Sequence, residues 1–194
     1  MTEHDSENEK RIVEGWQGRY YEDFEVGDIY KHPYGRTVTE ADNVWLTNIA
    51  MAPNAIHFNS VYAAENELDE ENPHEDPRIV NGIFVIMLAV GMSVMDVSQN
   101  AAANLGYDEV RHHAPVYHGD TIFAESEVLH KRESESRNHV GLVETELRAY
   151  NQDGDLVLSL KRTPMIFKRE YAQPDAATPT GWVEGIGTQL DDLE

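Results

Sequence analysis

The segment Asn54-Ala55-Ile56-His57 holds the best candidate for catalytic chemistry in this sequence. It follows a helix break, so its histidine is expected in a loop that can face a cleft. An imidazole in such a loop can act as a general base near neutral pH, and the Asn54 amide can hold a water or a carbonyl beside it. The same spacing also allows His57 to cap the next helix or to be buried with its hydrogen bonds satisfied.

A second candidate is the pair Asn81-Gly82 at the start of a long apolar segment. If that segment is a helix, its free backbone N–H groups and its dipole can stabilise an oxyanion that develops on a ligand. Gly82 has no side chain, so a ligand can approach its backbone closely. Simple helix entry explains the same pair equally well.

Three histidines at 112, 113 and 118 are a weaker signal for a metal site, because His112 and His113 would point to opposite faces of a strand. The absence of cysteine removes thiolate metal sites, thiol nucleophiles and disulfides. No phosphate-binding glycine loop and no Ser/His/Asp pattern is present. We therefore do not expect a metal site at these histidines.

Four segments are expected to position the first candidate. The pattern predicts a strand at 28–37, a helix over 39–51 with acidic residues in its first turn, and a short helix at 60–66. The acidic segment 67–77 is typical of a solvated insertion.

The second half of the chain changes from helical to alternating periodicity. Residues 79–97 are apolar on nearly every side, which is typical of a helix enclosed by other elements. Strands are expected around 110–117 and at 122–130, 140–150 and 156–167, with a hairpin turn at 151–154. One enclosed helix with a run of antiparallel strands predicts an α+β fold in which the sheet wraps the helix. The domain is expected over residues 19–170, between an acidic arm (1–18) and an acidic tail (171–194).

Charge and hydropathy narrow the possible partners. The chain carries 36 acidic and 15 basic residues in 194, a formal charge of -21, which argues against nucleic acid and against anionic membrane surfaces. The start is polar, and the longest apolar run, Ile83–Met95, is short of the ~20 residues that span a bilayer. A cytoplasmic location is therefore expected.

The same charge predicts a dependence on salt. Lysine is scarce while Asp and Glu occur along the whole chain, a composition typical of halophilic proteins. Because KCl screens the repulsion between surface carboxylates, the melting temperature should rise steeply between about 0.1 and 2 M KCl. A melting temperature that stays constant over this range in a thermal scan would remove the halophilic interpretation.

Several blocks of the sequence together resemble a known family. They are residues 21–28 (YEDFEVGD), 36–42 (RTVTEAD), 54–58 (NAIHF), 79–82 (IVNG) and 115–121 (PVYHGDT). In this order they resemble the MaoC-type hydratases of the hot-dog fold, over about residues 20–168. The stretches 91–94, 104–111 and 150–154 more narrowly resemble the haloarchaeal mesaconyl-CoA hydratases, also called β-methylmalyl-CoA dehydratases, of the methylaspartate cycle.

The resemblance implies reversible addition of water to the C=C bond of an enoyl-CoA. His57 and Asn54 match the family motif and would activate the water, and the Gly82 N–H would polarise the thioester carbonyl. Alanine stands at 52, where the family has an aspartate that shares this task. The CoA thioester would be the substrate, so no cofactor is implied.

Binding residues and partners are expected as well. A substrate carboxylate would need a cation, for which Arg36, Arg78 and Arg111 are candidates, with Asn81 as a further substrate contact. The family implies a homodimer or higher homo-oligomer joined through sheet edges. Two alternatives are a hot-dog thioesterase, which would release free CoA, and a non-catalytic acyl-CoA-binding subunit, which Ala52 makes plausible.

Overall fold

The computed structural model describes residues 16–66, 72 and 74–171. Its sheet is antiparallel and has the order β1-β4-β5-β6-β3, with β2 also paired to β4. The strands are β1 (Ile29–Lys31), β2 (Arg36–Thr37), β3 (Ala101–His112), β4 (Thr121–Glu133), β5 (Val140–Tyr150) and β6 (Leu156–Phe167). The α-helices are α1 (Glu40–Ile49), α2 (Ser60–Glu65) and α3 (Gly82–Met92). Short helical turns are η1 (Tyr21–Asp23), η2 (Ala55–His57), the π-turn η3 (Val94–Ser98) and η4 (Arg169–Tyr171).

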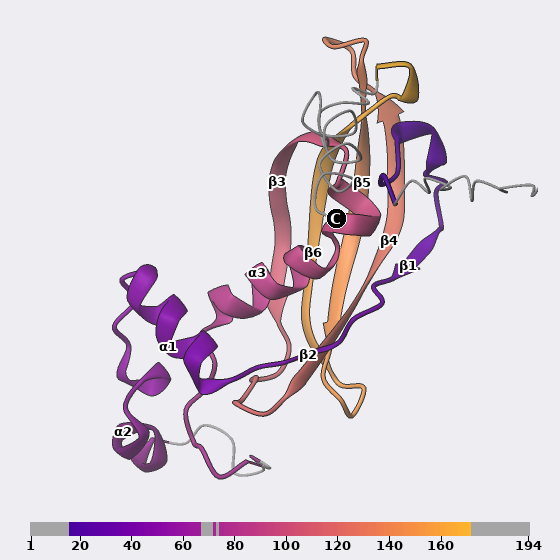
Figure 1. Cartoon of the computed structure of the whole chain (residues 1–194). Helices are drawn as coiled ribbons and strands as arrows, with labels where there is room; N and C mark the ends of the chain where they lie inside the picture. Colours follow the sequence, from indigo (N-terminus) through magenta and orange to yellow (C-terminus); the bar gives the residue numbers. More distant parts are fainter. Residues whose placement is uncertain (1–15, 67–71, 73, 172–194) are drawn as a thin grey trace, which may run out of the picture.

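The main core lies between α3 and one face of the sheet. Figure 1 shows α3 lying across the long strands, with α1 and α2 beyond its N-terminal end. Phe84, Val85 and Ala89 of α3 are buried in one cluster with Leu147 of β5 and Leu160 of β6. Each large apolar side chain buried this way contributes roughly 1.5–3 kcal/mol. This packing confirms the predicted α+β fold and fixes where α3 begins.

The prediction that the long helix is enclosed is wrong for the described chain. Ile83 and Met87 of α3 are 53% and 52% exposed, and Met95 of the following turn is similarly exposed. The helix packs on the sheet with one side only, because no described element covers its other side. An apolar surface therefore remains along α3.

Most predicted elements are confirmed. α1, α2, β5 and β6 lie where the pattern placed them, and the turn after β5 has Gly154 at a φ of 87°. The strand predicted at 28–37 is split into β1 and β2, since Pro33 lies between them and cannot donate a ladder hydrogen bond. The strand expected at 110–117 instead starts at Ala101 and ends at His112, ahead of Pro115.

Only part of the acidic segment 67–77 is described, and its last part is not a solvated insertion. His74 Nε2 lies 2.9 Å from a carboxylate oxygen of Asp120, which is buried. Asp76 is bound by Arg78 and by His118. These polar contacts hold the end of the segment against the domain. The acidic composition of the segment therefore did not predict that its last residues are packed.

The described part of the predicted N-terminal arm contacts the domain. The Trp16 indole donates a hydrogen bond to the Met95 carbonyl, and Asn100 Nδ2 donates to the Gln17 carbonyl. Residues 1–15 and 172–194, which hold the rest of the arm and nearly all of the tail, lie outside the described residues. Among the described helices, none is both long and apolar enough to cross a membrane.

Candidate active site

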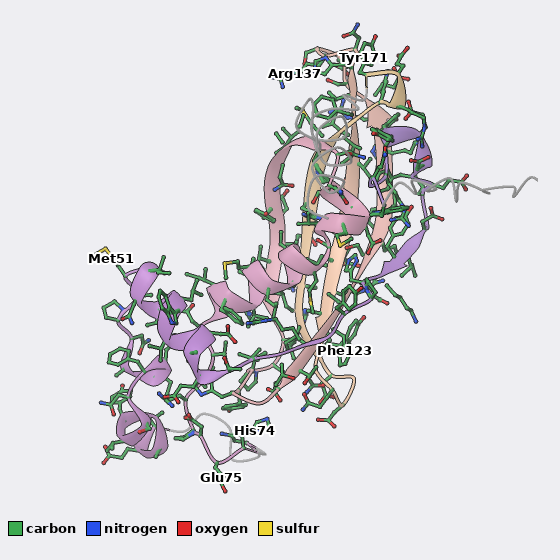
Figure 2. All side chains as sticks on the ribbon, viewed as in Figure 1. Met51, His74, Glu75, Phe123, Arg137 and Tyr171 are labelled. Carbon is green, nitrogen blue, oxygen red and sulfur yellow. The ribbon has the colours of Figure 1, made fainter. Side chains whose placement is uncertain are left out.

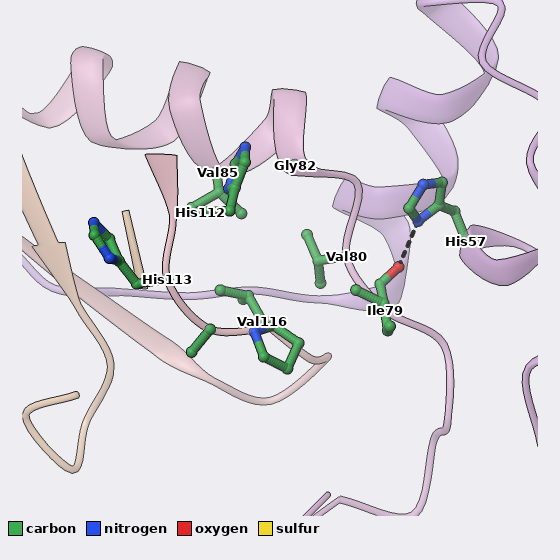
Figure 3. Close-up of a pocket in the computed structure, with 10 residues that line it drawn as sticks. His57, Ile79, Val80, Gly82, Val85, His112, His113 and Val116 are labelled. Carbon is green, nitrogen blue, oxygen red and sulfur yellow. Dashed lines mark hydrogen bonds between the residues drawn. The ribbon is translucent and has the colours of Figure 1, made fainter. Parts of the chain in front are cut away.

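A pocket of about 380 Å³ lies between η2, the start of α3 and the end of β3. His57, Gly82 and His112 line it together with apolar side chains such as Val80 and Val85. Figure 3 shows these residues around one space, although they come from distant parts of the sequence. The volume and the mainly apolar lining are typical of a site for a small ligand. The fold therefore brings both sequence-predicted catalytic elements, His57 and Gly82, into one pocket.

His57 is held in a defined tautomer. Its Nδ1 lies 2.9 Å from the Ile79 carbonyl oxygen, drawn as a dashed line in Figure 3. A carbonyl oxygen only accepts, so Nδ1 carries the hydrogen, and in the neutral ring the lone pair is on Nε2. No described residue hydrogen-bonds to Nε2. The half-buried ring is thus arranged as a base that can accept a proton from a ligand in the pocket.

Asn43 of α1, fully buried, joins the two parts of the site. Its Nδ2 donates to the His57 carbonyl at 2.8 Å and lies 3.3 Å from the Ile79 carbonyl. Its Oδ1 accepts the Asn81 backbone N–H at 2.9 Å. One amide therefore fixes the position of η2 relative to the start of α3.

The side-chain amide of Asn43 also fixes the tautomer of His118. Since Asn43 Nδ2 is a donor, His118 Nε2, 3.0 Å away, must accept, and His118 Nδ1–H donates to Asp76 at 2.9 Å. Hydrogen bonds from Arg78 hold the pKa of Asp76 well below its usual range, and His118 adds to this effect. His118 is therefore part of a satisfied structural network rather than a ligand-binding group.

The start of α3 is capped so that one N–H is left for a ligand. The Asn81 side-chain oxygen accepts the Ile83 N–H at 3.0 Å, and the Asn81 carbonyl accepts the Phe84 N–H. Among the described residues, none accepts from the Gly82 N–H. The Asn81 side chain thus acts as the helix cap, and Gly82 supplies the free donor at the positive end of the helix dipole.

His112 lies directly against Gly82. A Cβ built on Gly82 would be 2.8 Å from His112 Nε2, so only glycine permits this approach. Burial lowers the pKa of His112, and the neighbouring charge of His113 lowers it further. His112 is therefore a neutral imidazole at neutral pH.

The other motif residues lie beside the pocket rather than in its lining. Asn54 Oδ1 accepts the Ile56 N–H at 3.3 Å, and the exposed Asn54 side chain caps η2. Ala52 precedes this turn, and its carbonyl accepts the Asn54 N–H. A direct role of Asn54 in holding water stays a prediction.

The three candidate arginines differ in their partners. Arg78 binds Asp76 and Glu40, and its pKa is raised by its hydrogen bonds to Asp76. Arg36 pairs with Asp42 at 2.6 Å, and its side chain is half exposed. Arg111 is exposed and lies next to His112 at the end of β3. Arg111 is therefore the candidate with the fewest competing carboxylates.

Two residues of the site were missed by sequence reasoning. Asn43 shares its face of α1 with Leu46 and Thr47, which are buried, so a polar residue on a buried helical face was the available signal. His112 was considered only as a metal ligand. Across the described residues there is no group of three or more His, Asp or Glu side chains arranged to hold a metal ion.

Comparisons with known proteins show the family of the chain. A model of the mesaconyl-CoA hydratase family matches residues 6–191. The mesaconyl-CoA hydratase of Cereibacter sphaeroides is 35% identical over 163 residues, which are 84% of this chain and 45% of that protein. The crystal structure of a MaoC domain protein from Chloroflexus aurantiacus has a TM-score of 0.71 and 30% identity, and the match covers 81% of this chain and 43% of that one.

The fold is the hot-dog fold. A Mycobacterium tuberculosis protein described as having a double hot-dog fold matches with a TM-score of 0.70 and 22% identity, over 81% of this chain and 47% of that one. The chain thus spans about half the length of each of these three proteins. By its sequence, its fold and the matching family model, the chain belongs to the mesaconyl-CoA hydratase family of MaoC-type hot-dog hydratases.

Proposed function

We propose that this protein catalyses the reversible hydration of an enoyl-CoA, with mesaconyl-CoA as the substrate and β-methylmalyl-CoA as the product. The observation that carries the proposal is the pocket in which the His57 imidazole and the free Gly82 N–H face one space. A base for water and a donor for a carbonyl oxygen are the two functions that this reaction needs. The similarity to the Cereibacter mesaconyl-CoA hydratase supports the choice of substrate.

The reaction follows from these two groups. The Gly82 N–H donates a hydrogen bond to the thioester oxygen, which draws electrons from the C=C bond. His57 Nε2 removes a proton from water as the water oxygen bonds to the β-carbon, and the negative charge moves to the thioester oxygen. The His57 imidazolium then returns the proton to the α-carbon on the same face. No oxidant or metal is needed for this balance.

The substrate's free carboxylate would require a cation near the pocket. Arg78 is already bound by two carboxylates, Asp76 and Glu40. Arg36 is paired with Asp42 and could exchange partners only at the cost of that ion pair. None of the three arginines is among the residues that line the pocket, so the carboxylate contact is not assigned to one of them.

The proposal is tested by incubating the chain with mesaconyl-CoA in molar KCl and following two products. The proposal expects β-methylmalyl-CoA and no free CoA. Release of free CoA and mesaconate would instead identify a thioesterase.

Alanine at 52 favours a second candidate function, a non-catalytic acyl-CoA-binding subunit, because the family carboxylate is missing. Ala52→Asp separates the two. If this position faces the reacting water, the added carboxylate should raise turnover, by up to the ~10²–10⁴-fold range of a positioned acid–base group. Calorimetric binding of mesaconyl-CoA without turnover, in both the natural chain and Ala52→Asp, would favour the binding subunit.

We further propose that two chains pair through the edge of β3. This strand ends the sheet, and Leu105 and Val110 on it are 56% and 40% exposed. Figure 2 shows a further exposed apolar side chain, Met51, protruding beyond α1. A long strand edge without a partner can pair with the edge of a second chain, which supports the proposal.

Light scattering in 2 M KCl should therefore give at least twice the chain mass of 22.0 kDa. Placing lysines on the edge with Leu105→Lys and Val110→Lys together should produce monomers, since charged side chains block strand pairing. Val61→Lys on α2, which is 68% exposed and lies outside β3, is the control and should stay paired. A natural chain that remains a monomer would overturn the pairing.

A further inference from the structure

His112 borders the same space as the free N–H of Gly82, yet the hydration scheme above gives it no task. Its Nε2 faces Gly82 so closely that a methyl group at that position would lie 2.8 Å from it. Figure 3 shows the ring beside the first turn of α3, on the pocket side of β3. Within the described residues the ring has no hydrogen-bond partner. A polar ring is thus held at the point where a ligand carbonyl would meet the helix.

The neighbouring histidines, His57 and His113, have hydrogen-bond partners of their own. His113 Nε2 lies 2.8 Å from the Ser159 hydroxyl, and His57 Nδ1 is bound to the Ile79 carbonyl. His57 therefore offers the pocket a lone pair, whereas the Nε2 of His112 is available as a donor. The two histidines that line the pocket are suited to opposite tasks.

We infer that His112 is a second catalytic residue of the proposed hydration, whose Nε2–H donates to the thioester oxygen beside the Gly82 N–H. The inference rests on the proposed function and adds an oxyanion donor to it. Two donors on one oxygen stabilise the enolate charge better than one, and removal of one such donor typically costs ~10²–10³ in turnover. This role involves a hydrogen bond only, so no proton leaves His112.

The surroundings of His112 suit a neutral donor. Burial and the charge of His113 lower the pKa of His112, so its ring stays uncharged at neutral pH. The positive end of the α3 dipole acts in the same direction, as it does for the neutral electrophilic histidine of triosephosphate isomerase.

The test measures the carbonyl itself. Methylsuccinyl-CoA with a carbon-13 thioester carbonyl is the saturated counterpart of mesaconyl-CoA and cannot be hydrated. Its C=O stretching frequency is recorded by infrared difference spectroscopy when bound to the natural chain, His112→Ala, His112→Gln and the control His130→Ala. His130 is exposed on β4 and outside the pocket. Circular dichroism checks that each variant is folded, and turnover of mesaconyl-CoA is measured in parallel.

The natural chain and His130→Ala should shift the stretch to lower frequency by the same amount. His112→Ala should lose part of this shift and lower kcat by about 10²–10³-fold, with a smaller change in KM. His112→Gln should recover part of both, because its amide N–H can donate although it cannot transfer a proton.

An unchanged shift and kcat in folded His112→Ala would overturn the inference and leave the hydratase proposal standing. Equal losses in His112→Ala and His112→Gln would overturn the donor role in favour of proton transfer. The absence of any shift in the natural chain would overturn the thioester site itself, and with it the proposed function.

Discussion

Replacing His57 by alanine is expected to reduce the turnover of mesaconyl-CoA by about 10²–10⁴-fold, the range of a positioned acid–base group. The hydrogen bond from Nδ1–H to the Ile79 carbonyl leaves the lone pair of the neutral ring on Nε2. The alanine variant has no such lone pair. Because the family aspartate is alanine here, no carboxylate at position 52 can compensate. Initial rates of hydration at saturating substrate measure the effect.

The fold should survive this change, since the ring is only half-buried and the Asn43 contact is to the backbone carbonyl of His57. Thermal scans of His57→Ala and the natural chain should therefore nearly coincide. Near-full hydration by the folded variant would exclude His57 as the base. Asp42 and Glu40 would not replace it, because each is paired with an arginine and neither lines the pocket.

Asn43→Ala is expected to be the most destabilising of these changes. The change removes the Asn43 amide, which is the hydrogen-bond partner of the His57 carbonyl, the Asn81 N–H and His118 Nε2 around this buried side chain. Buried groups that lose a partner cost ~1–3 kcal/mol each, and partial rescue by water leaves an expected loss of about 2–4 kcal/mol. The melting temperature should fall by roughly 4–16 °C for a chain of this size.

Asn48→Ala is the matched control for that measurement. Asn48 lies on the same helix but is exposed, so its replacement changes helix propensity without breaking the buried network. Both variants are compared at one protein concentration, because pairing of chains would shift the melting temperature. A melting temperature of Asn43→Ala equal to that of Asn48→Ala would show that this amide does not hold η2 to α3.

Much of the fold could be predicted because its signals are local. Thr39 with Asp42 begins α1 as a capping pair, and Asp42 accepts the Thr39 N–H at 2.9 Å. The alternation in 140–150 and 156–167 places apolar residues on one face of β5 and β6. Such patterns depend only on neighbours in the sequence.

The uncovered side of α3 could not be predicted in this way. An apolar residue at Ile83 or Met87 has the same pattern whether the chain itself or a second chain covers it. Periodicity therefore predicts that a helix face is apolar, but it does not predict whether the same chain or a second chain covers that face.

The candidate site was predicted only in part for a related reason. His57 and Gly82 were found because their motifs are contiguous, and the pocket joins them. Asn43 and His112 act across 14 to 38 residues of sequence, through Asn43 with His57 and Asn81 and through His112 with Gly82. Such pairings arise from tertiary packing, which no local pattern records.

The central claim is that this pocket adds water to a double bond and leaves the thioester intact. Reaction of the chain with mesaconyl-CoA in oxygen-18 water, followed by mass spectrometry of all CoA species and free acids, tests it most directly. The account predicts one oxygen-18 atom in an intact β-methylmalyl-CoA, formed by the natural chain and strongly reduced in His57→Ala. Oxygen-18 found in free mesaconate with release of CoA, or unlabelled mesaconyl-CoA alone, would contradict it.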